Sequence, residues 1–304
     1  MAVLPVILMM VVGYTAKKCN VVKEEDVPKV NSVAFRIFLP VMTFNSIYTS
    51  ELSSSVKPQL MTYALCAVIL SFILSWIFAE KFVKQRDRKG VVIQGIFRSN
   101  YLIIGGPIAA NLMGSNELGV IAVLSAVIVP TFNMFAVICL EWYNGKKPSI
   151  PVLIKDVLST PLVVASILGV LVKLLNIEFP EFANELINDM SAVASPLMLV
   201  MLGASIKFNG VKNHVRELVA VCMGRLVVMP GIFLSLGAAL GFRGMDFAAL
   251  IGVFASSTAA ASYTMAQQMG GDGELAGNIV VCTSTMCSFT LLLWSLLFKT
   301  IGVI

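Results

Sequence analysis

The chain has 304 residues, of which 58% are hydrophobic and 13% charged, and its formal net charge is +5. A soluble domain carries about a quarter charged residues, so this composition excludes a soluble globular protein and predicts a polytopic membrane protein. The length has room for roughly ten spans of about 20 residues and for no separate soluble domain. The basic residues lie mostly in short loops between apolar runs, which is typical of membrane topology and argues against nucleic acid as a partner.

Apolar runs separated by polar breaks predict ten membrane-spanning helices. In chain order they cover about residues 2–16, 31–49, 58–79, 91–112, 118–142, 152–175, 184–206, 215–241, 244–268 and 276–298. The first run has no basic residue before it and is followed directly by Lys17 and Lys18. A cleaved signal peptide carries its charges in front, so we expect a retained first span with an external N-terminus.

The distribution of Lys and Arg predicts the orientation of the chain. With an external N-terminus, fifteen of the 22 basic residues fall in the inner connections, four on the outer side and three within spans. An excess of Lys and Arg marks cytoplasmic loops. We therefore expect a multi-pass protein of the plasma (inner) cell membrane with both termini on the outer side.

An internal repeat divides the chain into two halves. Residues 95–118 and 252–275 align without a gap, and they share Gly95/Gly252, Phe97/Phe254, Ser99/Ser256, Ala109/Ala266, Gly114/Gly271, Glu117/Glu274 and Leu118/Leu275. Earlier in the two halves, Pro5 matches Pro161 and Pro40 matches Pro196. The repeat predicts two five-helix units, residues 1–148 and 149–304. Because five is odd, the second unit enters the membrane inverted relative to the first, an arrangement that suits transport by alternating access.

The fourth and ninth predicted spans have the composition of broken helices. The fourth carries Gly105-Gly106-Pro107, and proline in mid-span removes a backbone donor and lets the helix unwind. The ninth has no proline, but it carries the polar residues Ser257, Thr258, Tyr263, Thr264 and Gln267. If the two breaks cross at the midplane, half-helix N-termini point their partial positive charge at a site for an anionic group. The alternative is a simple kink at Pro107 with small residues serving close helix packing.

Several other polar residues fall inside predicted spans. Arg98 lies deep in the fourth span and Arg225 in the eighth, where charges are costly, usually paired and often functional. Arg98 either attracts a carboxylate substrate or pairs with a carboxylate such as Asp189. Thr43 and Asn133 either line the substrate path or form hydrogen bonds between helices.

No enzyme motif is present in the sequence. It contains no GxSxG, no HExxH and no phosphate-binding loop. The six cysteines are scattered and form no CxxC, and the lone His214 cannot complete a metal site. We therefore expect a protein that is not an enzyme and that has no metal ion or cofactor.

Three motifs together resemble the auxin efflux carrier family, and the resemblance runs over essentially the whole chain. They are Phe97-Arg98-Ser99-Asn100-Tyr101 followed by Gly-Gly-Pro-Ile-Ala, the segment Pro196–Gly203, and Ser257–Tyr263 with Gln267-Gln268. The resemblance implies a ten-helix inverted-repeat fold, similar to bile-acid symporters and sodium/proton antiporters, in which spans four and nine cross as broken helices. It also implies a scaffold of spans one, two, six and seven and a moving transport unit of spans three to five and eight to ten.

The resemblance also implies a function. The family exports auxin in plants, and its bacterial members are described as malate or malonate permeases. Asn100 and Pro107 match the family's Asn and Pro, and by resemblance they take its substrate-site role. Two departures matter: the long polar loop between the halves of the plant carriers is absent, and Thr264 stands where their second crossing has a proline.

Together these patterns predict a secondary transporter that moves a small mono- or dicarboxylate by alternating access. The alternatives are a sodium- or proton-coupled organic anion symporter and a channel-like membrane protein. The expected partners are the organic anion and the lipid bilayer, and a homodimer stays an open option. The predicted substrate-binding residues are Thr43, Arg98, Asn100, Tyr101, Gly105, Gly106, Pro107, Asn133, Ser257, Thr258, Tyr263, Thr264 and Gln267.

Overall fold

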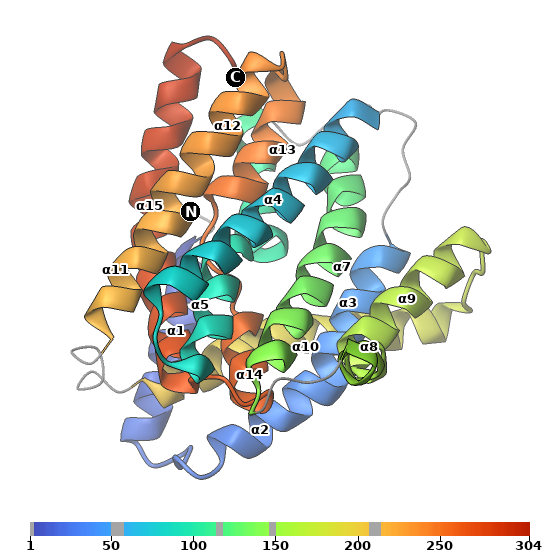
Figure 1. The fold of residues 1–304 in the computed structure, drawn as a ribbon. Coiled ribbons are helices and arrows are strands. Elements are labelled where there is room, and N and C mark those ends of the chain that lie inside the picture. The colour runs from blue at the N-terminus through green and yellow to red at the C-terminus, as the bar shows by residue number, and fades with distance from the viewer. Residues whose placement is uncertain (1–2, 50–57, 114–117, 146–149, 207–213) are drawn as a thin grey trace.

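The structure is a computed structural model that describes residues 3–49, 58–113, 118–145, 150–206 and 214–304, and no β-strand is present among them (Figure 1). The helices, with η marking a π-helical turn, are α1 (Val3–Lys18), α2 (Val27–Val33), η1 (Ala34–Phe38), α3 (Leu39–Tyr48), α4 (Pro58–Phe82), α5 (Arg86–Phe97), η2 (Tyr101–Gly105), α6 (Gly106–Met113), α7 (Leu118–Tyr143), α8 (Ile150–Ser159), α9 (Pro161–Leu174), α10 (Glu181–Ser205), α11 (Val215–Met223), η5 (Gly224–Val228), α12 (Met229–Ala239), α13 (Gly244–Ala255), α14 (Ala261–Gln268) and α15 (Gly273–Thr300).

Six helical stretches in the described residues are long and apolar enough to cross a membrane. They are Val27–Tyr48, Pro58–Phe82, Val123–Tyr143, Glu181–Ser205, Val215–Ala239 and Gly273–Thr300. Each coincides with a predicted span, which confirms those six predictions. Their outward faces carry exposed apolar side chains, such as Leu292 and Phe289 on α15, as expected of surfaces that contact lipid. The protein is thus an all-helical, multi-pass membrane protein.

The predicted span 152–175 is bent and is not one straight helix. It consists of α8 and α9, which meet at an angle of 69°. The cause is local: Thr160 is extended, with φ −67° and ψ 128°, and Pro161 begins α9. A residue before proline is disfavoured in the helical conformation because the proline ring clashes with its backbone.

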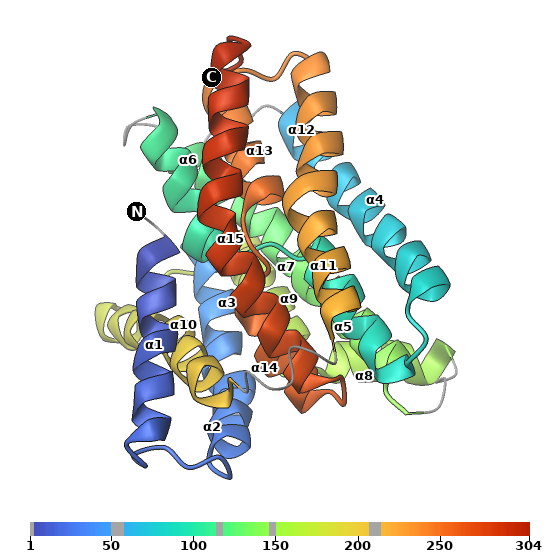
Figure 2. The same ribbon diagram turned by 90° about the vertical axis from the view of Figure 1, so that its left-hand side faces the viewer.

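The helices form two groups that lie side by side (Figures 1 and 2). One group contains α1, α2 to α3, α9 and α10, in which α1 packs on α10 and α3 on α9. Gly13 and Gly203 mark the closest approach of α1 and α10. A Cβ atom on Gly13 would lie 1.8 Å from the carbonyl oxygen of Val200, and one on Gly203 would lie 1.9 Å from that of Met10. Small residues at such a contact let the two backbones approach closely.

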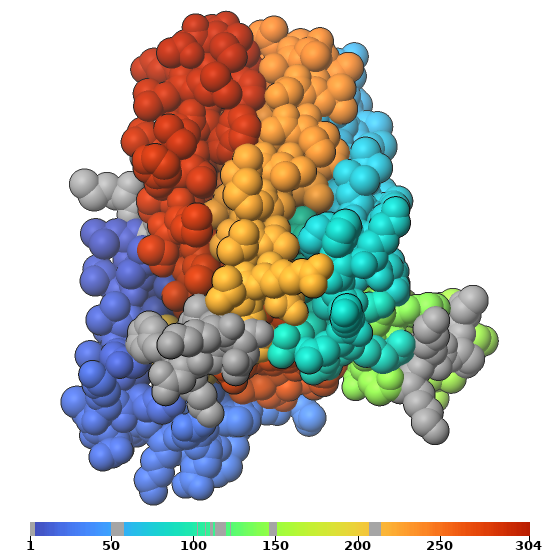
Figure 3. All heavy atoms as spheres, turned by 60° about the vertical axis from the view of Figure 1, so that its left-hand side comes forward, coloured from blue at the N-terminus to red at the C-terminus, as the bar shows by residue number. Residues whose placement is uncertain are grey.

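The second group contains α4 to α7 and α11 to α15. On one face of the molecule α15 lies beside α11 and α12 (Figure 3). An ionic cluster ties α5, α11 and α15 at one end of this group: Arg88 lies 3.3 Å from Glu217 and 3.1 Å from Asp272, and His214 Nε2 lies 3.3 Å from Asp272. Asp272 also accepts a hydrogen bond from the backbone N–H of Leu275 and so caps α15. These contacts hold the group together away from its centre.

The predicted spans 91–112 and 244–268 are both broken. In the first, α5 ends at Phe97, and the chain continues through Arg98, Ser99 and Asn100 before η2 begins. In the second, α13 ends at Ala255, and α14 begins at Ala261. The break in the first span therefore lies before Gly105-Gly106-Pro107, and the prediction that this tripeptide is the break is wrong. The π-helical turn η2 and α6 run on continuously there, since a π-helical turn rearranges the helical hydrogen bonds around the missing proline donor.

Candidate functional site

The two breaks cross and bond to each other at the centre of the second group. Ser99 and Thr258 form an antiparallel β-bridge. The backbone N–H of Asn100 donates to the carbonyl oxygen of Ser257 at 2.8 Å. The backbone N–H of Ala259 donates to the carbonyl oxygen of Arg98 at 3.3 Å. Unwound backbone away from water is tolerated only where its polar groups find partners, and here each break supplies partners for the other.

A single arginine closes the side of the crossing where α5 and α13 end. Arg225 comes from η5 and is 1% exposed. Its Nε donates to Ser256 O at 2.8 Å and one terminal nitrogen donates to Val253 O at 2.8 Å. The other terminal nitrogen reaches the carbonyl oxygens of Ile96 and Phe97 at 3.4 and 3.2 Å. One guanidinium thus bonds the last carbonyls of both half-helices, where the helix dipoles are negative.

The opposite side of the crossing, where η2 and α14 begin, borders a small cavity of about 40 Å³. Five predicted residues line it: Thr43, Arg98, Asn100, Tyr101 and Asn133. The structure therefore brings together side chains from α3, α7 and the first break. None of the described residues that line this cavity is acidic. The cavity lies between the two groups of helices.

Arg98 is buried at this cavity, and no carboxylate among the described residues forms an ion pair with it. Its guanidinium donates to Gln94 Oε1 at 2.9 Å, to Asn133 Oδ1 at 2.6 Å and to the sulfur of Met265. Asp189, the partner suggested by the sequence, is instead exposed on α10, and that pairing is wrong. The charge of Arg98 is therefore held by neutral groups, and it stays available to an anion.

Unpartnered polar atoms gather around the crossing. Asn100 Nδ2 and the hydroxyls of Ser99, Ser256, Ser262 and Thr264 are buried and have no hydrogen-bond partner among the described residues. A buried polar atom without a partner costs about 1–3 kcal/mol. Such a concentration marks a place where a ligand or water completes the hydrogen bonding. Asn100 is 4% exposed and lines the cavity, so its free amide is the best-placed donor among them.

The polar residues of the second break have a different environment. Thr258 donates its hydroxyl hydrogen bond to Gly95 O at 2.7 Å, and Ser257 accepts one from Ser284 at 3.2 Å. Both hydroxyls thus face the packed helices α5 and α15 and not the small cavity. The second break contributes to the cavity through Ala259 and Ala261.

The three residues of the predicted Gly-Gly-Pro site have separate positions. Gly105 meets α13 at Gly252, where an added Cβ atom would lie 2.3 Å from the Gly252 carbonyl oxygen. Gly106 faces Ile121, at 3.0 Å from such an atom. Pro107 lies in the first turn of α6, and its side chain is outside the described part of the structure. Gly105 therefore serves the close approach of the two broken helices.

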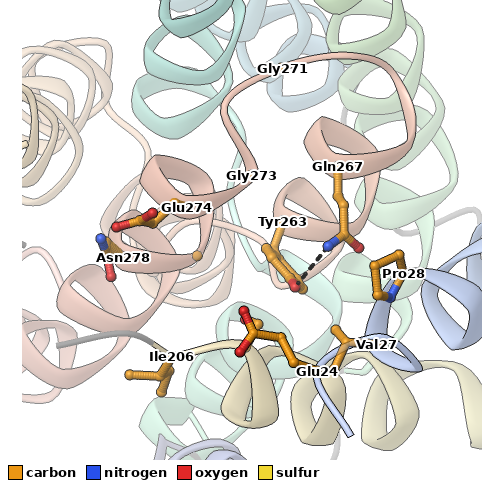
Figure 4. A pocket seen from close by; sticks show the side chains of 12 residues that line it. Glu24, Val27, Pro28, Ile206, Tyr263, Gln267, Gly271, Gly273, Glu274 and Asn278 are labelled. Carbon is orange, nitrogen blue, oxygen red and sulfur yellow. Dashed lines mark hydrogen bonds between the residues drawn. The ribbon is translucent and has the colours of Figure 1, made fainter. Parts of the chain in front are cut away.

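A larger cavity of about 320 Å³ lies between α2, α10, α14 and the start of α15 (Figure 4). Tyr263 and Gln267 line it, and Gln267 Nε2 donates to the Tyr263 hydroxyl at 3.3 Å. Figure 4 shows Glu24 and Tyr263 reaching into it from different elements. Gln267 Oε1 also accepts a hydrogen bond from Asn31 at 2.6 Å, which links the two groups of helices beside the cavity.

Sequence reasoning missed Glu24, Asn31 and Asn278 at this cavity. Glu24 lies in a segment read as a loop, and Asn31 lies at the first residue of a predicted span. Tyr263 and Gln267 are the two predicted site residues that line this cavity, and Glu274, which the repeat pairs with Glu117, lines it as well. Among the described residues, no group of three His, Cys, Asp or Glu side chains could hold a metal ion.

Comparison with known proteins assigns this architecture to a family. The model of the family described as "Membrane transport protein" matches residues 1–295. The chain is a member of this family. It is the auxin efflux carrier family that the sequence motifs resemble, and the resemblance is confirmed over nearly the whole chain.

Two archaeal relatives of this membrane transport protein match along almost their full length. An "Uncharacterized transporter" of Methanothermobacter thermautotrophicus is 22% identical over 295 residues, covering 96% of each chain. "Uncharacterized transporter MJ1031" of Methanocaldococcus jannaschii is 23% identical over 305 residues, again covering 96% of each chain. The family and both relatives support a membrane transporter as the function of the chain.

Proposed function

We propose that this transporter is a secondary permease that carries a small organic anion, with a dicarboxylate of the size of malonate or malate as the preferred substrate. The observation that carries the proposal is the crossing itself. Two half-helices begin at a cavity that also holds the buried Arg98 and the free amide of Asn100, and no described acidic residue lines it.

A count of charges supports two carboxylates. The N-termini of η2–α6 and of α14 each carry roughly half a positive charge. Arg98 adds one full charge, and its hydrogen-bond partners in the described part of the chain are neutral groups. The opposite side adds little, because Arg225 offsets the negative ends of α5 and α13. The sum is about two positive charges, which a dicarboxylate matches and a monocarboxylate leaves half unmatched.

The ten-span inverted repeat belongs to the same proposal. The packing of α1 on α10 has its counterpart in the packing of α9 on α3, as expected if residues 1–148 and 149–304 are related units. In this arrangement α1 to α3, α9 and α10 form the scaffold, and the second group of helices forms the transport unit. Both termini lie outside, and the cavity beside Tyr263 and Gln267 opens inward.

The small size of the cavity at the crossing supports alternating access. The cavity at the crossing, about 40 Å³, is far smaller than the roughly 150 Å³ that holds a molecule of benzene. An organic anion of about the size of benzene therefore does not fit unless the two groups of helices separate at this cavity. The polar contacts to be broken include Asn31 to Gln267 at 2.6 Å and Asn133 to Thr43 at 3.3 Å.

Counterflow in proteoliposomes tests the transport mechanism. Vesicles loaded with unlabelled malonate should accumulate labelled malonate transiently, because a carrier exchanges substrate across its two states. A channel-like protein would equilibrate the label without this overshoot. If the labelled malonate equilibrates across the vesicle membrane without an overshoot, the permease is contradicted.

Thiol labelling tests the orientation. Cys19 is exposed in the connection after α1, which we place on the inner side. An impermeant thiol reagent should modify Cys19 in inside-out vesicles and not in intact cells. Because Cys66 is also exposed, the measurement uses the Cys66→Ala protein. Modification of Cys19 in intact cells would reverse the proposed topology.

A further inference from the structure

Arg225 has a position at the crossing that the substrate site does not explain. It lies outside the small cavity, on the far side of the two unwound segments, and its side chain is buried. It stands in the π-helical turn η5, which is followed by Pro230 in the first turn of α12. A π-helical turn is rare and often found at functional sites, so its position here points to a role for Arg225 beyond packing.

Within the described part of the chain, the Arg225 guanidinium donates hydrogen bonds only to backbone carbonyls. It donates hydrogen bonds to the carbonyl oxygens of Ile96, Phe97, Val253 and Ser256, at 2.8 to 3.4 Å. These oxygens belong to the ends of α5 and α13, where each helix dipole places roughly half a negative charge. The single positive charge of Arg225 therefore offsets about two half-charges. No carboxylate of residues 3–49, 58–113, 118–145, 150–206 and 214–304 is paired with Arg225.

The same set of oxygens has the chemistry of a sodium site. Unwound carbonyls and half-helix C-termini are the groups that coordinate sodium in transporters with broken helices. A guanidinium that bonds four such carbonyls occupies the directions in which they would face a metal ion. A fixed arginine also stays bound through every cycle, whereas a sodium ion must bind and leave.

We propose that Arg225 is a positioning residue that acts as a tethered cation at the crossing. It holds the ends of α5 and α13 together and takes the place of a coupling metal ion, so that anion binding at the opposite side needs no sodium. The statement that anion binding needs no sodium rests on the proposed function. The statement that Arg225 holds the ends of α5 and α13 together concerns the crossing alone and can be tested without substrate.

The substrate-free test is thermal unfolding of the purified protein with and without guanidinium ion. Arg225→Ala should melt at a lower temperature than the wild type, and low concentrations of guanidinium or methylguanidinium should raise its melting temperature by filling the space left by the side chain. Arg243→Ala is the matched control, because Arg243 also bonds carbonyls at a helix end, those of Ala238 and Phe242, but is exposed and remote from the crossing. Equal responses of the two variants would overturn the tethered cation.

Uptake of labelled malonate tests the consequence for transport. In the wild type, uptake should be equal in sodium and in choline buffers. In Arg225→Ala the rate of malonate uptake should fall about tenfold or more, because several charge-assisted hydrogen bonds are lost. Addition of guanidinium or sodium should restore uptake. Sodium-dependent uptake by the wild type overturns the inference.

Two other results can occur: Arg225→Ala fails to insert into the membrane, or the wild type takes up no malonate. If Arg225→Ala does not insert, Arg225→Lys replaces it, since a lysine keeps the charge but reaches fewer carbonyls; uptake should then fall with sodium independence retained, and unchanged uptake would overturn the inference. If the wild type takes up no malonate, the proposed function fails, and the thermal test still decides whether Arg225 acts as a tethered cation.

Discussion

The two broken helices at the crossing differ in what they present to the small cavity beside it. The first break, between α5 and η2, places the side chains of Arg98, Asn100 and Tyr101 at the cavity. The second break, between α13 and α14, turns the hydroxyls of Ser257 and Thr258 toward neighbouring helices. Two segments related by a sequence repeat thus differ in their surroundings: under the proposed function, the first break recognises the anion and the second holds the crossing in place.

The largest effect is expected where both broken helices meet. Gly105→Ala places a Cβ atom 2.3 Å from the carbonyl oxygen of Gly252, so backbone has to move and the free energy of unfolding should fall by about 3 kcal/mol. Gly231→Ala is the control, because its nearest neighbour is the Trp294 ring at 3.5 Å. Thermal unfolding in detergent measures both. Equal melting temperatures would show that the two helices do not depend on this contact.

The next effect isolates the first break. Arg98→Gln removes the uncompensated charge at the cavity, and the affinity for malonate should fall about ten- to a hundredfold through the loss of charge-assisted bonds. Uptake of a monocarboxylate such as acetate should fall less. The measurement is the ratio of the two uptake rates in proteoliposomes. A ratio unchanged from the wild type would remove Arg98 from substrate recognition.

A smaller effect isolates the second break. Thr258→Val keeps the shape of the side chain and removes its 2.7 Å hydrogen bond to Gly95 O, so stability should fall by about 1 kcal/mol while the KM for malonate stays the same. Thr290→Val on α15 is the control, because its hydroxyl bonds only within its own helix. An increase in KM with unchanged stability would place Thr258 in recognition.

The smallest effect concerns the contact between the two groups of helices. Thr43→Val removes the acceptor for Asn133, a bond of 3.3 Å between neutral groups, and should change the malonate uptake rate by about twofold. Thr131→Val on α7 is the control, since Thr131 bonds only to Val127 of its own helix. A loss as large as that of Arg98→Gln would make Thr43 a direct substrate contact.

The sequence predicted the apolar helices well because their signal is local. The predicted spans 58–79 and 276–298 correspond to α4 and α15, where composition alone sets the helix. The repeat of residues 95–118 in 252–275 also identified the two segments that contain the breaks, although it did not give the position of either one, since α5 ends at Phe97 and α13 at Ala255. Periodicity and repeats therefore sufficed for the elements and for the segments that cross.

The position of the break and the partners of the charges were not predictable in the same way. Gly105-Gly106-Pro107 carries the stronger local signal, yet the chain unwinds at Arg98 to Asn100, because there the backbone gains partners from the other break. That gain is a tertiary contact, which no local pattern contains. Likewise Asp189 lies on an exposed face of α10, and only the packing of the helices determines that face.

Equilibrium binding of labelled malonate to the purified protein tests most directly whether the crossing is the anion site. The comparison uses Asn100→Ala and Asn184→Ala, because each asparagine has one buried amide atom without a partner and only Asn100 lies at the crossing. We predict saturable binding to the wild type and to Asn184→Ala, and binding at least about tenfold weaker to Asn100→Ala, with melting temperatures within the wild-type range. Wild-type affinity in a folded Asn100→Ala protein would contradict the assignment of the substrate site to the crossing.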